Sequence, residues 1–161
     1  MSYDKDGVEA GKGQIVQSVL NQLNELPFYA LSGPKSLGRE WLEREVSPLL
    51  DLISDERDAL RTWVEHASVQ IGRALKDVPE RGKILCTGGG CHNTFLMKRI
   101  QEYTRAPVVI PKPEIVDFKE AIVFALLGKL RLEKTPNVYG GITGSGRDSI
   151  SGCVYLPPVK N

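Results

Sequence analysis

The feature that most constrains this chain is a run of three glycines, Gly88, Gly89 and Gly90. Before it, residues 83–86 predict a short buried strand, and after it residues 93–103 predict a helix. Glycines lack Cβ atoms, so a flat ligand can lie directly against the backbone of such a turn. The helix N-terminus adds unpaired N–H groups and the positive end of the helix dipole beside it. This strand–turn–helix unit therefore predicts a nucleotide site.

The local pattern leaves a second interpretation open, because glycine-rich turns between a strand and a helix also occur without a ligand. The standard phosphate-binding motifs do not match. A dinucleotide-binding motif would need a third glycine where Asn93 stands. A P-loop ending at Gly11-Lys12 would need glycine at position 6 and Ser or Thr at position 13, where the chain has Asp6 and Gly13. The sequence therefore supports neither a Rossmann-type site nor a P-loop.

The composition excludes several classes of partner. The 161 residues carry 21 basic and 20 acidic side chains, and a formal net charge of +1 gives no electrostatic argument for binding nucleic acid or a membrane surface. No apolar run has the length of a membrane span, and no signal-peptide core follows Met1. We therefore expect a soluble, cytoplasmic protein of one domain that binds neither nucleic acid nor membrane.

The cysteines and histidines indicate neither disulfides nor a metal. Cys86, Cys91 and Cys153 are odd in number and lack the CxxC spacing, so no disulfide framework is expected. The chain has two histidines, His66 and His92, and neither joins a four-ligand zinc pattern. We expect His66 to pack inside the protein and no metal to be held.

The remaining pattern predicts a helix-rich α/β fold with a short, partly parallel sheet. Helical periodicity predicts helices over residues 8–26, 55–76, 93–103 and 118–132, and a short helical turn over residues 41–46. Apolar runs predict strands over residues 83–86, 107–110 and 151–156. Because a helix separates the first two strands, we expect them to pair in parallel.

Burial can be predicted for two of these helices. The helix over residues 55–76 has an apolar stripe, which predicts its core face as Leu60, Val64, Ala67, Ile71 and Leu75. The helix over residues 118–132 has almost no polar face, so we expect it to be largely buried.

Two further segments are candidates for binding, each with a plain alternative. The loop over residues 28–39 concentrates glycine, proline, cations and a hydroxyl, as anion- or sugar-binding loops do, but it can also be a solvated connector. Its candidate residues are Lys35, Ser36, Gly38 and Arg39. Glu120 is a functional candidate if it is buried beside a cleft. If it is exposed in the first turn of its helix, it only complements the dipole.

Six groups of residues, in one order over nearly the whole chain, match the pattern of one known family. They are Tyr3-Asp4-Lys5-Asp6-Gly7 with Ala10 and Gly13; Leu26-Pro27-Phe28-Tyr29; Pro34-Lys35-Ser36 with Gly38-Arg39-Glu40; Gly88-Gly89-Gly90 with His92-Asn93; Glu120-Ala121 with Phe124-Ala125; and Thr143-Gly144 with Arg147. With these groups the chain resembles the C-terminal part of the anhydro-N-acetylmuramic acid kinases, which belong to the sugar kinase and actin superfamily.

The resemblance implies an actin-like ATPase lobe of ribonuclease-H-like fold, with ATP bound between two lobes. Members of the family use ATP and water to open the 1,6-anhydro ring of anhydro-N-acetylmuramic acid. In the same event they phosphorylate the 6-oxygen, which gives N-acetylmuramic acid 6-phosphate for cell-wall recycling. The resemblance thus implies ATP, Mg²⁺ and an anhydro-amino sugar as ligands, and a homodimer.

The resemblance also assigns roles by matching position. Gly88, Gly89, Gly90 and Asn93 would line the adenosine of ATP. The residues of the cleft loop would contact nucleotide or sugar, and these are Lys35, Ser36, Gly38 and Arg39. Glu120 would face the sugar.

The parts that the family needs for chemistry have no match in this sequence. We expect residues 1–161 to be a single ATP-facing C-terminal lobe, without the N-terminal lobe that carries the phosphate loop. The general base is expected upstream of the matched segment and the Mg²⁺ ligands outside this chain, so no residue here is assigned a catalytic role. The chain alone is expected to be inactive as a kinase. Two alternatives are a module that binds a nucleotide or an amino sugar without catalysis, and a dimerisation domain.

Overall fold

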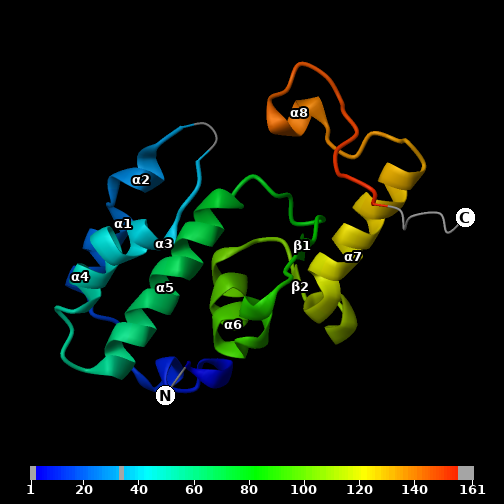
Figure 1. The fold of residues 1–161 in the computed structure, drawn as a ribbon. Helices are drawn as coiled ribbons and strands as arrows, with labels where there is room; N and C mark the ends of the chain where they lie inside the picture. The colour runs from blue at the N-terminus through cyan, green and yellow to red at the C-terminus, as the bar shows by residue number, and fades with distance from the viewer. Residues whose placement is uncertain (1–2, 33–34, 156–161) are drawn as a thin grey trace, which may run out of the picture. The chain divides into compact units, whose positions relative to one another are not determined.

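A computed structural model describes residues 3–32 and 35–155 of the chain (Figure 1). The fold divides into two compact units, which we call unit 1 (Met1–Pro111) and unit 2 (Lys112–Asn161). The described part is helix-rich and contains one short parallel sheet of two strands, so it belongs to the α/β class, as predicted.

Unit 1 begins with two short 3₁₀ helices, η1 (Lys5–Gly7) and η2 (Ala10–Lys12), followed by helix α1 (Gln17–Asn24). The prediction of one helix over residues 8–26 is therefore wrong in its first half. The chain is extended at Gly13, where a Cβ atom would lie 2.1 Å from the backbone oxygen of Arg57. This close approach to a distant helix forces the break, and α1 starts only after it.

The next helical turns follow one another closely. They are α2 (Pro27–Ala30), α3 (Arg39–Trp41), the π-helical turn η3 (Leu42–Val46) and α4 (Ser47–Leu50). The helical turn predicted over residues 41–46 is thus present within a longer run. The wide turn occurs just before Pro48, which has no N–H to donate to a carbonyl four residues earlier.

Helix α5 (Glu56–Ala74) is the long helix of unit 1, as predicted. The Asp55 carboxylate caps it by accepting from the backbone N–H of Arg57 at 2.8 Å. It contacts α1 and α6 (Thr94–Tyr103), and so has covered faces on more than one side (Figure 1). The core of unit 1 includes the buried residues Val19, Leu23 and Val46.

The predicted apolar stripe of α5 is only partly buried. Among its five residues, Val64 is buried, while the others are half-buried or exposed. The fully buried side chains on this helix are instead polar, namely Thr62, Glu65, His66 and Ser68. Neighbouring segments supply hydrogen-bond partners to Thr62, Glu65 and His66, and the Ser68 hydroxyl donates to the Val64 carbonyl of its own helix. Because their bonds are made, polar residues can occupy the enclosed face.

Strand β1 (Ile84–Leu85) pairs in parallel with β2 (Val108–Val109), with Ile84 opposite Val108. Between the two strands lie the 3₁₀ turn η4 (Gly89–His92) and helix α6. The two predicted strands are present, each over two residues, and their parallel pairing and the helix at 93–103 are confirmed. The prediction that the first strand is buried holds for Ile84 but not for Leu85, which is 65% exposed. Successive side chains of a strand point to opposite faces, and only the Ile84 face of β1 is covered.

Unit 2 contains α7 (Pro113–Leu132) and α8 (Gly140–Thr143). The prediction that the apolar helix is largely buried is wrong for this chain: Phe124 is 70% exposed, and Phe118, Ile122 and Leu126 are exposed as well. The reason is that the described part of unit 2 supplies little more than α8 and irregular segments to cover a twenty-residue helix. In residues 3–32 and 35–155, no helix is long and apolar enough to cross a membrane.

The strand predicted over residues 151–156 does not form in residues 151–155, and Leu156 lies outside the described residues. A single antiparallel bridge joins Val138 to Ser149 instead. Beyond it, the Asn137 side chain makes both hydrogen bonds to the backbone of Ser151. Its amide donates to the Ser151 carbonyl at 3.1 Å and its oxygen accepts from the Ser151 N–H at 2.7 Å. A side chain thus replaces the partner strand.

Candidate nucleotide-binding site

The three glycines form an open turn directly after β1. Gly88 has φ = 92° and ψ = 173°, a backbone conformation that L-residues rarely adopt. The carbonyl oxygen of Gly88 accepts from the N–H of Cys91 at 3.0 Å, and that of Gly90 accepts from the N–H of Asn93 at 3.1 Å. These bonds fold the turn onto the start of α6.

The absence of side chains at Gly89 and Gly90 leaves free space. Both residues are exposed, and a Cβ atom built on either would meet nothing within 4 Å. Neither glycine is therefore required by packing within this chain. The turn follows the carboxyl end of a strand in a parallel pair, which is where α/β proteins place their ligands. The space beside it can admit a ring or a ribose.

Asn93 links the glycine turn to α6. Its Oδ1 accepts from the backbone N–H of Leu96 at 2.8 Å, which is the bond of a helix N-cap. The side chain is half-buried. The structure therefore gives Asn93 a structural task next to the turn, and its contact with adenosine stays a prediction.

The cleft loop, which contains the candidates Lys35, Ser36, Gly38 and Arg39, hydrogen-bonds mainly to residues close to it in the sequence. The Lys35 ammonium donates to the carbonyl oxygens of Phe28, Tyr29 and Leu31 at 3.1, 3.3 and 3.1 Å. It also lies 5.0 Å from the centre of the Phe28 ring. Lys35 thus closes the C-terminal end of α2, and its three N–H donors are used there.

The other residues of the loop are on the surface. Ser36, Gly38 and Arg39 are exposed, and Arg39 Nε donates to the Glu43 carboxylate at 2.7 Å. Lys35 borders a hollow of about 600 Å³ in unit 1, between the ends of α1, α2 and α5. The structure therefore places one candidate of this loop beside a cavity.

Glu120 lies in unit 2, on α7, and its side chain is exposed. Because α7 begins at Pro113, Glu120 is beyond the first turn, and the acidic residue in the first turn is Glu114. Glu120 therefore meets neither of the two conditions considered from the sequence, because it is exposed rather than buried and it lies beyond the first turn. Its proposed contact with a sugar stays a prediction.

A buried carboxylate on α5, which bonds to the second half of α6, was missed by sequence reasoning. Glu65, 2% exposed, accepts from Arg99 Nε at 2.9 Å and Nη2 at 2.6 Å, from Arg61 Nη1 at 2.7 Å, and from the Tyr103 hydroxyl. Burial alone would raise the pKa of Glu65, but the bonds from Arg99 and Tyr103 and the charge of Arg61 outweigh it, and the pKa is lowered. This cluster fastens α6 to α5.

A second buried group is His66. Its Nδ1 lies 2.8 Å from Asn24 Oδ1, and its Nε2 lies 2.8 Å from the Tyr29 hydroxyl. Because Asn24 Oδ1 is an acceptor, Nδ1 carries the proton and Nε2 accepts from Tyr29. Burial and then the charge of Arg73 lower the pKa of His66 to about 4, so the ring is neutral at pH 7. His66 is a packing residue, as predicted.

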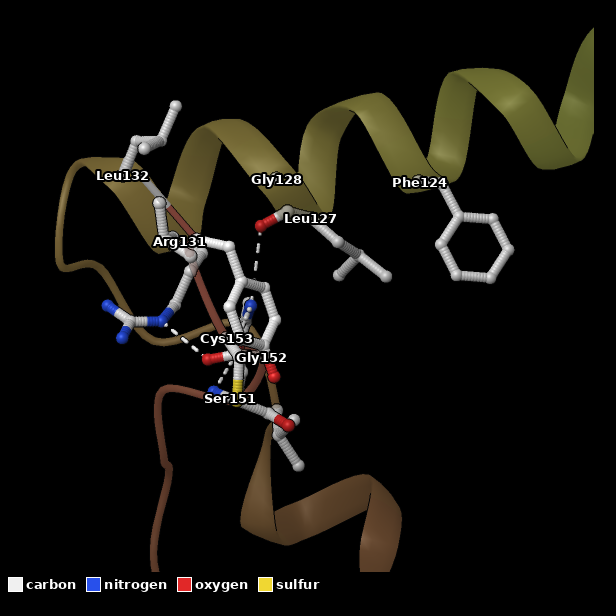
Figure 2. A pocket seen from close by; sticks show the side chains of 12 residues that line it. Phe124, Leu127, Gly128, Arg131, Leu132, Ser151, Gly152 and Cys153 are labelled. Atoms are coloured by element: carbon white, nitrogen blue, oxygen red, sulfur yellow. Dashed lines mark hydrogen bonds between the residues drawn. The ribbon is translucent and has the colours of Figure 1, made fainter. Parts of the chain in front are cut away.

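Unit 2 has a hollow of its own, of about 630 Å³, which Figure 2 shows. One wall is the last part of α7, with Phe124, Leu127 and Leu132, and the other consists of Asn137 and Val138 together with residues 151–155. Arg131 Nε donates to the Gly152 carbonyl at 2.8 Å and so ties the two walls together. None of the predicted site residues lines this hollow. Its surface is mostly apolar, which does not suit a phosphate.

The described residues do not fit a Mg²⁺ site. Within residues 3–32 and 35–155, no group of three His, Cys, Asp or Glu side chains could hold a metal ion. The glycine turn and the η4 residues after it also contain no carboxylate. The open turn suits the nucleoside end of a ligand, and the metal-bound phosphates would need other groups.

Comparison with known proteins identifies the relatives of this chain. A family model described as "Anhydro-N-acetylmuramic acid kinase" matches residues 1–157. A protein of that name from Synechocystis sp. is 32% identical over 177 residues, covering 98% of this chain and 44% of the relative. Proteins of the same name from Saccharophagus degradans and Vibrio cholerae are 31% and 32% identical, each over 96% of this chain and 44% of the relative. The chain thus spans less than half the length of these relatives.

Proposed function

The chain belongs to the anhydro-N-acetylmuramic acid kinase family, and we propose that it forms the ATP-facing C-terminal part of such a kinase. The whole enzyme would use ATP and water to open the 1,6-anhydro ring of anhydro-N-acetylmuramic acid. Water would add to the anomeric carbon while the released 6-oxygen takes the γ-phosphoryl group. In this proposal the chain is a lobe of actin-like fold in a cytoplasmic enzyme of cell-wall recycling.

The observation that carries this proposal is the open glycine turn in a chain whose family match spans 157 residues. Gly89 and Gly90 are exposed and have no neighbour where a Cβ would be, so packing does not explain their lack of side chains. A ring or ribose lying on the backbone does explain it. We therefore place the adenosine of ATP against Gly88, Gly89 and Gly90.

The cleft loop and Glu120 receive secondary roles in the proposal. Ser36 and Arg39 are exposed and can reach a ligand, whereas the Lys35 ammonium is already bonded to three carbonyl groups. Lys35 would therefore act by holding the loop, with the extended Gly38 as the N-cap residue of α3 (Arg39–Trp41). Glu120 would face the sugar in the assembled enzyme.

The chain alone should not transfer phosphate. Phosphoryl transfer depends on positioning and on positive charge that converges on the phosphate from several sides. The described residues contain no group that could hold a metal, and no general base is assigned among them. In the proposal, Mg²⁺ and the base are held by the part of the whole enzyme that this chain does not match.

The proposal is tested by titrating the ¹⁵N-labelled chain with ATP and following its amide resonances. We expect shifts centred on Gly88, Gly89 and Gly90, and no turnover of ATP with the anhydro sugar. Gly89→Val should abolish the shifts, because a branched side chain would fill the place of the ring. The matched control is Gly141→Val in α8, where a Cβ also meets nothing within 4 Å. Equal binding by the Gly89→Val variant would refute the glycine site.

A second candidate role is association, and the exposed apolar side chains of α7 favour it. Phe118, Ile122 and Phe124 are 61%, 52% and 70% exposed, although they are among the most apolar residues of the chain. In this proposal α7 would form part of a homodimer contact. Light scattering after size exclusion tests this role. The parent chain should be a dimer and the Phe124→Glu variant a monomer. If the parent chain and the variant are both monomers, the role is rejected.

A further inference from the structure

Two segments that lie far apart in the sequence meet at the start of α6, where Gly7 lies against Asn93. Gly7 has φ = 73° and is buried, and a Cβ atom on it would lie 2.4 Å from Asn93 Oδ1 and 2.6 Å from the Cβ of Phe95. L-residues rarely adopt this φ, and there is no space for a side chain. Position 7 therefore requires glycine on two independent grounds.

The segment that carries Gly7 is itself held in place. The Asp4 carboxylate accepts from the backbone N–H groups of Glu9 at 3.0 Å and Ala10 at 2.9 Å. The Thr94 hydroxyl donates to the carbonyl oxygen of Asp6 at 3.2 Å. Residues 4–10 thus form a fixed support beneath the N-terminus of α6.

Asn93 connects this support to the glycine turn through two bonds. Its backbone N–H donates to the carbonyl of Gly90 at 3.1 Å, which closes the turn. Its side-chain Oδ1 accepts from the Leu96 N–H at 2.8 Å, which starts the helix. A displacement of Asn93 would therefore move the last glycine of the turn and the first turn of α6 together.

We propose that Asn93 is a positioning residue of the nucleotide site, and that Gly7 sets its place by allowing the close approach of the two segments. This inference rests on the proposed function for its ligand. In this proposal Asn93 acts through its Oδ1 atom and its backbone N–H, so its Nδ2 group is not needed to bind the nucleotide. It also makes Gly7, which lies outside the turn, a determinant of nucleotide affinity.

The first test compares Gly7→Ala with Gly11→Ala, using adenosine as a neutral probe. Gly11 is a matched control in the same segment, because its Cβ would meet the Phe95 ring at 3.6 Å, an ordinary contact. In ¹⁵N spectra without ligand, Gly7→Ala should displace the amide resonances of Gly88, Gly89 and Gly90. Gly11→Ala should leave them in place. The dissociation constant for adenosine should rise about fivefold in Gly7→Ala, the size expected for loss of a helix N-cap.

The second test changes Asn93 itself and stands even if Gly7→Ala does not fold. Aspartate is as good an N-cap as asparagine but has no Nδ2 donor, whereas alanine cannot cap. In Asn93→Asp, the amide resonances of the three glycines and the affinity for adenosine should be those of the parent chain. In Asn93→Ala, these resonances should shift and the affinity should fall. If Asn93→Asp weakens the binding of adenosine as much as Asn93→Ala does, Asn93 contacts the ligand directly and the inference is overturned.

The failure of the inference and that of the proposed function are distinguishable. If the parent chain shows no shift of the glycine resonances with adenosine, the nucleotide site is wrong. The spectra recorded without ligand then test by themselves whether Gly7 and Asn93 position the glycine turn. Unmoved glycine resonances in both Gly7→Ala and Asn93→Ala would refute it.

Discussion

The carboxylate of Glu65 and the guanidinium of Arg99 form a two-pronged ion pair between α5 and α6, with Oε1–Nη2 and Oε2–Nε distances of 2.6 and 2.9 Å. The Glu65 side chain is almost completely buried, and that of Arg99 is 17% exposed. Arg61 and Tyr103 complete the bonds to the carboxylate. The helix that starts at the glycine turn is thus held at its other end by a buried charge cluster.

Removing this charge should destabilise unit 1 strongly. Glu65→Ala removes the buried partner of the largely buried Arg99 guanidinium and leaves it only the exposed Glu102. Breaking a comparable buried pair costs about 3–5 kcal/mol. Urea unfolding followed by circular dichroism measures the loss. The control is Glu102→Ala, which removes the exposed partner of the same Arg99. It should cost no more than about 1 kcal/mol. Equal losses in the two variants would contradict the role of the buried pair.

Acid should weaken the fold through His66. The pKa of His66 is lowered to about 4 by burial, against 6.5 for an exposed ring. Folding therefore favours the neutral ring. The stability that the neutral ring contributes is complete above pH 6.5 and is lost as the pH falls toward 4. The loss amounts to up to about 3 kcal/mol. His66→Gln cannot gain this proton, so its free energy of unfolding should fall less over that range. Parallel pH dependence in urea titrations of parent and variant would reject this account.

Two helical glycines should respond to alanine with opposite signs. A Cβ on Gly72 of α5 would lie 2.6 Å from the Cβ of Tyr103 and 2.7 Å from its backbone oxygen, so Gly72→Ala forces α5 and α6 apart. Overpacking of this kind costs about 1–3 kcal/mol. Gly128 of α7 has nothing within 4 Å, so Gly128→Ala should gain up to about 1 kcal/mol from helix propensity. Thermal unfolding of both variants checks the signs, and a stabilised Gly72→Ala would contradict the close approach.

Lys35 should matter for its own loop more than for a ligand. Its ammonium bonds to three carbonyl oxygens at the end of α2, so Lys35→Met should loosen that end. We expect faster hydrogen exchange at the amide of Leu31, which bonds to the Phe28 carbonyl at 3.3 Å. The affinity for adenosine should be unchanged. A loss of affinity with unchanged exchange would show instead that Lys35 contacts the nucleotide.

The parts of the fold that the sequence predicted correctly depend on local signals. The glycine run fixed the turn between β1 and α6, and the apolar runs on either side of α6 predicted the parallel pair. The helix predicted from residue 93 begins within one residue of that position, where Asn93 caps α6. Each of these signals comes from neighbouring residues, so spacing and residue type were sufficient.

The errors come from contacts between distant segments. The helix predicted over residues 8–26 is broken because Gly13 approaches the backbone of Arg57. The cluster around Glu65 depends on Arg99, which is 34 positions away. The apolar pattern of α7 showed that the helix needs a cover, but it could not tell whether this chain supplies one. For the candidate site, the same limit applies to Glu120, whose role depends on groups that no local pattern identifies.

The bond from Thr94 to Asp6 joins residues 88 positions apart, so the support beneath the glycine turn is completed only when the two ends of unit 1 have come together. Residues 4–10 can therefore dock only after α6, which comes much later in the chain, is available. The turn would then be among the last features of unit 1 to reach its final shape. Trimming the first dozen residues would leave the core residues Leu23 and Val46 in the chain and still deform the turn.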